Sequence, residues 1–373
     1  MISPQLPPPI IAEIVNCTEK SEKTILRKVK HYIASGADII DIGCVSNKAH
    51  PEKIPNIIDS IRSNFDVLLS IDSMNKSEIM AGINKDIDMV LSLDLGNYKD
   101  FMDIPKTIPI VILPTNIRNA DFPRNPKKRV ENLLKLTKIL QEAGFQKLIA
   151  DPLLETPISP GICNSLEAYF LYNKTVNQKN NKSSKLPLFF GVSNVVELMD
   201  IDSVGINGLL ASIALELEIG ILFTVEHSVK LMGGVSELKE SVKLNYLAHH
   251  RKSPPINQGI TLFRSKGKTR QKMPEIDTDN ALILDSDIPF YSPDKNGYFR
   301  IFSNNYSKKI YLLFYSNENV LLKTLIGNNA EALCKKFIQL GLTQNLEHLN
   351  YLGRELERAQ LCLELHKPYI QDD

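Results

Sequence analysis

Seven short apolar runs in this 373-residue chain each end in a polar side chain. The clearest run, Val67 to Ile71, ends at Asp72 and is followed at once by a helical pattern from Asn75 to Ile83. A buried strand that delivers an acid at its carboxyl end is how an α/β barrel builds an active site. The seven terminal polar residues are Asn16, Asp41, Asp72, Ser92, Asp151, Asn194 and Glu226. We expect them to meet at one face of the molecule.

Side chains of these types favour the binding of an amide-rich heterocycle. They include no paired histidines, so they lack the ligands that transition metals usually prefer. A carboxylate can accept two hydrogen bonds, one from a ring N–H and one from an exocyclic amino group. Asp72 and Asp151 are the candidates for this task, with Ser193 beside Asn194 as a further polar neighbour. The alternative for each Asp is that it only caps the helix that follows.

Three residues after the last of these runs could take part in catalysis. Glu226 could act as a base or pair with Lys230. His227 is the one histidine that lies close to an expected strand end, although a single histidine is often structural. Lys230 could bind an anion or be an exposed lysine. These alternatives stay open at the level of the sequence.

The elements that must position these residues alternate regularly between strand and helix. Eight strand-then-helix units fit into about 240 residues, which is the count that a (β/α)8 TIM barrel needs. We therefore predict a barrel over residues 1–248, with a first helix over residues 19–34 that begins after Thr18. An open doubly wound sheet is the alternative, but its strand ends would not form one ring.

The pattern changes after residue 248. Residues 249–280 are basic and irregular, which indicates a linker or a phosphate-binding flap. Residues 281–373 predict a small α+β domain of unknown role. Its expected strands are residues 281–284, 298–302 and 309–314, and its expected helices are residues 330–340 and 346–364.

Composition limits the classes of partner. The formal net charge is +1, so bulk electrostatics do not favour nucleic acid. No run approaches the roughly 18 apolar residues that a membrane span needs. The five cysteines are scattered, without a CxxC pair, which argues against a disulfide framework or a zinc site. We expect a cytoplasmic protein with a small-molecule ligand.

Four segments resemble the pterin-binding barrel shared by dihydropteroate synthases and methyltetrahydrofolate methyltransferases. They are Asn16-Cys17-Thr18, Gly36 to Gly43, Ser70 to Ser73 and Ala150-Asp151-Pro152. The resemblance implies that Asp72 and Asp151 hold the pterin ring, with Asp41, Ser92, Ser193 and Asn194 also at the pterin site. It further implies that Asn16 helps to hold a pyrophosphate bound to Mg²⁺. Barrels of this family are often dimers, so the resemblance also allows a homodimer.

Three segments depart from the synthase pattern. The fourth strand has Leu91-Ser92 where synthases carry Asn-Asp. Synthases carry a lysine after the seventh strand, but Gly191 to Val195 has Asn194 without that lysine, as in the methyltransferases. The Arg-x-His that follows the eighth strand in synthases is replaced here by the segment around Glu226-His227. The usual way of binding the pyrophosphate therefore does not carry over to this chain.

A closer resemblance is to archaeal dihydropteroate synthase-like proteins associated with tetrahydromethanopterin biosynthesis. These proteins share the Glu226 to Gly233 pattern and a small C-terminal domain with segments like Tyr351 to Gln360 and Pro368 to Asp372. The resemblance implies condensation of a 6-hydroxymethyl-dihydropterin pyrophosphate with an arylamine, either 4-aminobenzoate or its phosphoribosyl derivative. The alternatives are a methyltransferase that acts with a corrinoid protein and a non-catalytic pterin-binding scaffold.

Overall fold

The computed structural model describes residues 6–178, 185–228, 231–262 and 294–371. The chain divides into two compact units, Met1–Leu262 and Phe263–Asp373, and each is described by itself. The predicted linker, residues 249–280, begins in the last turn of a helix of the first unit, and its residues from 263 onwards lie outside the described ranges. Within those ranges, no helix combines the length and the apolar character that crossing a membrane would require.

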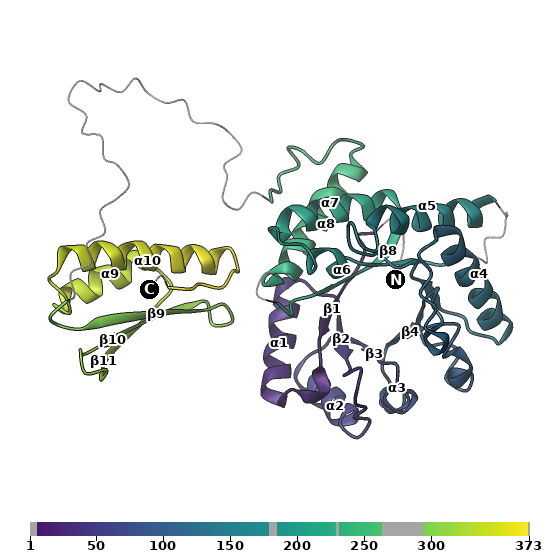
Figure 1. Ribbon diagram of the computed structural model, residues 1–373, viewed down its shortest axis with the longest axis horizontal. Coiled ribbons are helices and arrows are strands. Elements are labelled where there is room, and N and C mark those ends of the chain that lie inside the picture. Colours follow the sequence, from purple (N-terminus) through teal and green to yellow (C-terminus); the bar gives the residue numbers. More distant parts are fainter. Residues whose placement is uncertain (1–5, 179–184, 229–230, 263–293, 372–373) are drawn as a thin grey trace. The chain divides into compact units, whose positions relative to one another are not determined.

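The first unit is a closed barrel of eight parallel strands, in which each strand pairs with the next and β8 pairs with β1 (Figure 1). The predicted TIM barrel is therefore confirmed, and the open sheet is excluded. The strands are β1 (Ile10–Ile14), β2 (Ile39–Gly43), β3 (Leu68–Asp72), β4 (Met89–Leu93), β5 (Ile110–Ile112), β6 (Leu148–Ala150), β7 (Leu188–Gly191) and β8 (Ile219–Val225).

Helices surround the strands of this unit in Figure 1. They are α1 (Glu22–Ser35), α2 (Ile54–Asn64), α3 (Lys76–Ile83), α4 (Pro126–Glu142), α5 (Ile162–Gln178), α6 (Ser193–Val196), α7 (Ser203–Glu216) and α8 (Gly234–His250). Ser21 caps α1 by accepting the N–H of Thr24, so the predicted start of this helix at Thr18 is wrong. Thr18 instead lies in a short 3₁₀ turn, Cys17–Glu19.

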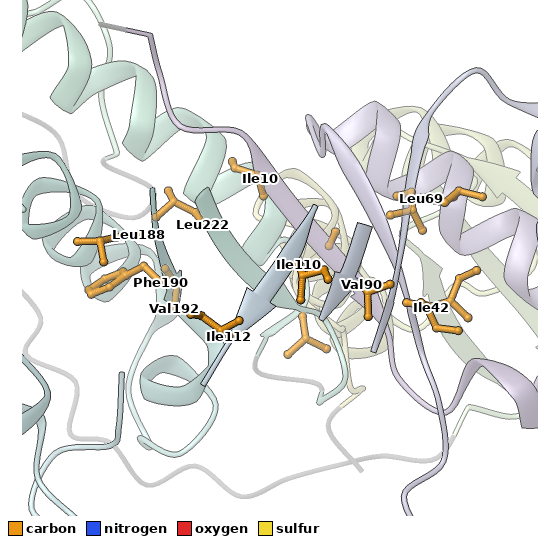
Figure 2. Close-up of a cluster of buried hydrophobic side chains, with 14 of the residues drawn as sticks. Ile10, Ile42, Leu69, Val90, Ile110, Ile112, Leu188, Phe190, Val192 and Leu222 are labelled. Atoms are coloured by element: carbon orange, nitrogen blue, oxygen red, sulfur yellow. The ribbon is translucent and has the colours of Figure 1, made fainter. Parts of the chain in front are cut away.

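Alternate residues of the strands belong to two different apolar clusters. The outward-facing set fills the space between strands and helices, and Figure 2 labels ten of its members, among them Ile10, Ile42, Leu69 and Val90. The inward-facing set fills the barrel itself: Ile11, Ile39, Met89, Leu91, Val111, Ile149, Phe189 and Ile221. Because successive side chains of a strand point to opposite faces, a residue two positions after an inner residue also points inward. This places Glu13 and Asp41 inside the barrel, towards its carboxyl end.

The second unit is an antiparallel sheet covered by two helices on one face. The sheet has the order β11-β10-β9, from β9 (Tyr298–Asn304), β10 (Lys309–Tyr315) and β11 (Leu321–Gly327). Phe299, Ile310 and Phe314 pack with residues of α9 (Ala330–Gln339) and α10 (Leu346–Glu364) to form its core. The predicted small α+β domain is confirmed here, although β11 was not expected from the sequence. The predicted strand at residues 281–284 lies outside the described residues.

Candidate active site at the carboxyl ends of the strands

Three carboxyl groups of neighbouring strands meet inside the barrel. Glu13 of β1 is the register partner of Asp41 of β2, and Asp72 ends β3, the next strand. Asp41 is fully buried and accepts a hydrogen bond of 2.5 Å from the hydroxyl of Ser70 at Oδ1. Its other oxygen, Oδ2, is buried without a hydrogen-bond partner in the described part of the chain. This cluster of carboxyl groups therefore has an oxygen atom without a partner among the described residues.

The close approach of these carboxyl groups favours their protonated forms. Burial raises the pKa of Asp41 well above its usual value, and the charges of Asp72 and Glu13 add to the effect. Burial also raises the pKa of Asp72. For Glu13, burial, Asp72 and Glu197 together raise the pKa to about 7, although Lys28 works in the opposite direction. Like charges this close cannot all ionise at neutral pH, so the cluster retains protons.

Ser92 joins this cluster because of an irregularity in β4. Its φ is 70°, in the left-handed region, and the register between β4 and β5 shifts between Val90 and Leu93. The extra residue lets Leu91 face inward while Leu93 faces outward. The Ser92 side chain then hydrogen-bonds Asp72 and opposes the upward shift of its pKa. The structure thus brings Asp41, Asp72 and Ser92 together, as predicted.

Asp151, directly after β6, is a second buried acid at the same end of the barrel. Its Oδ1 atom accepts the N–H of Leu153 at 2.8 Å and lies 2.9 Å from the hydroxyl of Tyr169. Oδ2 makes no hydrogen bond with the described residues, so it can accept one from a ligand. Burial raises the pKa of Asp151 to about 6, so the group is mostly ionised at neutral pH.

A buried arginine fixes the loop that carries Asp151. Arg129 of α4 is fully buried, and its guanidinium donates to the carbonyl oxygens of Pro123 at 2.7 Å and Leu153 at 2.8 Å. It also forms an ion pair with Glu155. This role was not predictable from the sequence, because a charged residue in a long amphipathic helix normally faces solvent.

Asn194 and Ser193 lie in α6, directly after β7. The Asn194 side-chain amide donates to the carbonyl oxygen of Leu154 at 2.9 Å, in the loop after Asp151. It also lies against Gly191, where a Cβ would be 3.1 Å from Asn194 Nδ2. Ser193 is buried. Asn194 is therefore placed beside the β6 end of the site.

Of the three predicted catalytic residues, Glu226 and His227 make no hydrogen bond to the carboxyl cluster within the described residues. Glu226 is buried, and its two oxygens accept the N–H of Val235 at 3.0 Å and contact His31 Nε2 at 2.9 Å. The carboxylate therefore stabilises the start of α8 and pairs with α1. His227 is exposed, and Lys230 lies outside the described residues.

Asn16 follows β1 in the left-handed conformation, with φ 50°. It precedes the 3₁₀ turn but its side chain makes no capping hydrogen bond, so the amide oxygen is not used locally. The described residues contain no group of three or more His, Cys, Asp or Glu that could hold a metal ion. Mg²⁺ commonly keeps several waters and uses one or two protein oxygens together with substrate phosphates. Asn16 fits that mode of binding, in which most ligands come from the substrate.

A large opening at the other end of the barrel contains none of these residues. It has a volume of about 1030 Å³ and is lined by the amino-terminal ends of the strands, including Pro9, Leu68 and Pro109. Active sites of TIM barrels lie at the carboxyl ends of the strands. We therefore place the site around Asp72 and Asp151 and not in this opening.

Glu13 is the site residue that the sequence patterns missed. Glu13 does not end an apolar run but interrupts the run from Ile10 to Val15, so it differs from the polar residues predicted at the strand ends. The alternation of side chains along the strand could have found it, since it lies two positions after the inner residue Ile11.

Two family models match parts of this chain. Residues 14–205 match the family described as pterin binding enzyme, and residues 293–372 match a family described as PterinBD-DUF4346. An uncharacterized protein of Methanocaldococcus jannaschii is 33% identical over 373 residues, which make up 100% of this chain and 70% of that protein.

Solved dihydropteroate synthases share the fold. The Yersinia pestis enzyme with a pterine-sulfa conjugate has a TM-score of 0.51 and 16% identity, over 67% of this chain and 96% of that chain. The Xanthomonas albilineans enzyme in complex with 7,8-dihydropteroate has a TM-score of 0.50 and 16% identity, over 67% and 95% of the two chains. These similarities concern the barrel alone. From the match over residues 14–205 and the similarity along the whole chain, the protein belongs to the pterin binding enzyme family.

Proposed function

We propose that this protein is a transferase that binds a dihydropterin between Asp72 and Asp151. The observation that carries the proposal is a pair of carboxyl groups in one barrel, half-buried Asp72 at the end of β3 and buried Asp151 directly after β6. The guanidine-like edge of a pterin carries an N–H and an amino group, which pair well with a carboxylate. In a buried site such hydrogen bonds are stronger than in water. Family membership supports the same ligand.

The reaction that we propose is condensation of a 6-hydroxymethyl-dihydropterin pyrophosphate with an arylamine. The bond between the methylene carbon and the pyrophosphate oxygen breaks, the amine nitrogen bonds to that carbon, and the amine loses a proton. The barrel would hold the two reactants in position and stabilise the leaving anion. In tetrahydromethanopterin or folate-type biosynthesis the arylamine would be 4-aminobenzoate or its phosphoribosyl derivative.

Asn16 is the residue that would hold Mg²⁺ in this reaction. A bound Mg²⁺ supplies charge neutralisation to the pyrophosphate. Asn16 contributes one amide oxygen at the carboxyl end of β1, on the same face as Asp41 and Asp72. Substitution Asn16→Ala should therefore weaken the Mg²⁺ dependence of pyrophosphate binding more than it weakens pterin binding.

The experiment that tests the proposal measures dihydropterin binding and pyrophosphate release by the whole chain. We expect Asp72→Asn and Asp151→Asn each to weaken pterin binding about tenfold or more, since each removes a carboxyl oxygen that accepts a hydrogen bond from the ligand. Such a bond is worth about 1.5–3 kcal/mol when the carboxyl group is charged. Asp66→Asn, an exposed carboxylate next to the start of β3, is the matched control and should bind as the wild type does. A wild-type protein that binds no dihydropterin would contradict the proposal.

A methyltransferase reaction is the second candidate, and the position of Asn194 favours it. Asn194 lies in the segment after β7 that lacks the lysine of the synthases, and its amide group lies at the β6 end of the site. An amide there could hydrogen-bond a ring nitrogen of the pterin. Methyl transfer from a methylated pterin to a corrinoid, without any use of pyrophosphate, would favour this candidate over the condensation.

A further inference from the structure

Lys28 of α1 extends to the corner between β1 and β8. Its Nζ atom lies 3.3 Å from the backbone carbonyl oxygen of Glu226, the first residue after β8, and 5.6 Å from the centre of the Tyr32 ring. The side chain is half-buried. A lysine of an outer helix is thus held at the carboxyl ends of the strands, on the side where Asn16 follows β1.

The Lys28 ammonium has no counter-ion in direct contact among the described residues. No carboxylate oxygen of that part of the chain lies within 4.0 Å of its Nζ atom, and its hydrogen bond goes to a neutral carbonyl. Glu226 attracts it from further away, but that carboxylate is already used by Val235 and His31. Burial and the neighbouring Lys20 lower the pKa of Lys28. A half-buried ammonium beside a second lysine costs free energy, which a bound anion would reduce.

The charge of Lys28 also acts on the carboxyl cluster, because it opposes the rise in the pKa of Glu13. Glu13 lies on β1, and Lys28 reaches the residue that follows β8, the strand paired with β1. An anionic group beside Lys28 would therefore be adjacent to the site proposed for the pterin. The chain also lacks the two cations expected after β7 and β8, where it carries Asn194 and Glu226-His227.

We propose that Lys28, reinforced by Lys20, binds the anionic pyrophosphate group on the substituent of the pterin. This inference rests on the proposed pterin-binding function and adds a residue that selects the charged ligand over the uncharged alcohol. Lys28 acts by holding the anion at the β1–β8 corner, where the leaving group of the condensation would separate from the methylene carbon. The negative charge of that group increases as the bond breaks, so the same contact would lower the barrier.

The experiment compares two ligands by calorimetry: 6-hydroxymethyl-7,8-dihydropterin and its pyrophosphate ester. We expect the wild type to bind the ester at least tenfold more tightly at low salt, with a ratio that falls as salt rises. Lys28→Met should reduce that ratio about tenfold while it leaves the affinity for the alcohol unchanged. Lys28→Arg should keep most of the preference. Lys30→Met, an exposed lysine of the same helix, is the matched control and should keep all of it.

The outcomes separate the inference from the function on which it rests. If Lys28→Met weakens both ligands equally, or lowers the melting temperature with the ratio unchanged, Lys28 is structural and the inference is wrong. If the wild type binds neither pterin, the proposed function fails. Binding of inorganic pyrophosphate alone then decides the anion site, because a Lys28-dependent affinity supports it and an affinity equal in wild type and Lys28→Met overturns it.

Discussion

The carboxyl group of Glu13 lies directly against the backbone of Gly43. A Cβ atom at position 43 would be 2.1 Å from Glu13 Oε1, so only glycine leaves room for this side chain. Gly43 is two residues after Asp41 on β2, and Glu13 is opposite Asp41 in the register of β1 and β2. The absence of a side chain at Gly43 on β2 therefore leaves room for the carboxyl group of Glu13 on β1.

Substitution Gly43→Ala should displace Glu13 without unfolding the barrel. The closest atoms belong to the end of a flexible side chain, which can rotate away. We expect a melting temperature within a few degrees of the wild type and a changed affinity for dihydropterin, measured by thermal unfolding and calorimetry. An unchanged affinity, with Glu13 in its original place in a crystal structure of the variant, would show that the contact has no role in the site.

The stability of the barrel should decrease as pH rises, because of Glu13. Burial and nearby carboxylates raise its pKa to about 7, against about 4.3 in an unfolded chain. The folded state then binds the proton more tightly, so its stabilising contribution is complete below about pH 4 and is lost as pH rises to about 7. Glu13→Gln cannot ionise and should exceed the wild type in free energy of unfolding by about 1–3 kcal/mol at pH 8.

Urea unfolding at pH 5 and pH 8 measures this difference. The increase in the free energy of unfolding caused by Glu13→Gln should be small at pH 5 and become larger towards pH 8. Glu19→Gln, an exposed glutamate six residues further along the chain, is the control and should show no such growth. An equal effect of Glu13→Gln at both pH values would contradict the assigned ionisation.

The regular parts of the fold could be predicted from the sequence because strands buried on both faces are apolar throughout. Each apolar run between two helical patterns became a barrel strand, and Asp72, Asp41 and Ser92 met as expected. The position of a polar residue after a strand, however, does not predict which groups its side chain contacts. Glu226 follows the same pattern as Asp151, yet its carboxylate is used by α8 and α1.

Residues that act from helices could not be predicted in this way. The roles of Lys28 and Arg129 depend on the direction of a long side chain and on which loop lies above it. Neither the direction of a side chain nor the position of a loop produces a periodic pattern in a single sequence. The strand β11 escaped prediction for a related reason, since most of its residues are exposed and show no alternation of apolar and polar positions.

Substitution of Arg129 should destabilise the barrel strongly. Arg129→Met leaves the carbonyl oxygens of Pro123 and Leu153 and the carboxylate of Glu155 without their donor. Loss of one partner of such a buried group costs about 3–5 kcal/mol. Arg129→Lys keeps the charge but not the planar arrangement of donors, so it should recover only part of this.

Chemical denaturation of the Arg129 variants checks this order. Lys127→Met, an exposed lysine of the same helix, provides the control and should lie within about 0.5 kcal/mol of the wild type. If Arg129→Met were as stable as the control, the guanidinium would not fix the Asp151 loop.

The second unit should lose stability when Asp294 is neutralised. Its carboxylate contacts His348 Nδ1 at 2.9 Å and also accepts from Thr343 and the N–H of Asn296. Burial favours the protonated form, but these hydrogen bonds outweigh it and lower the pKa of Asp294. The contribution is therefore present above the ordinary aspartate pKa of about 3.9 and is lost as pH falls below that value.

Asp294→Asn should lower the free energy of unfolding of this unit by about 1–3 kcal/mol at pH 7. The difference from the wild type should shrink at pH 3, where the wild-type carboxylate gains a proton. Glu318→Gln, an exposed change in the same unit, is the comparison. A loss for Asp294→Asn that stays equal at pH 3 and pH 7 would mean that the charge is not responsible.

A crystal structure of the protein with 6-hydroxymethyl-7,8-dihydropterin would show whether the ring lies between Asp72 and Asp151. We expect the ring at the carboxyl ends of β3 and β6, with its N–H and amino groups 2.6–3.2 Å from the carboxylates of Asp72 and Asp151, roughly the range of normal hydrogen bonds. A ring bound in the opening at the amino-terminal ends of the strands, or one that contacts neither carboxylate, would contradict this expectation.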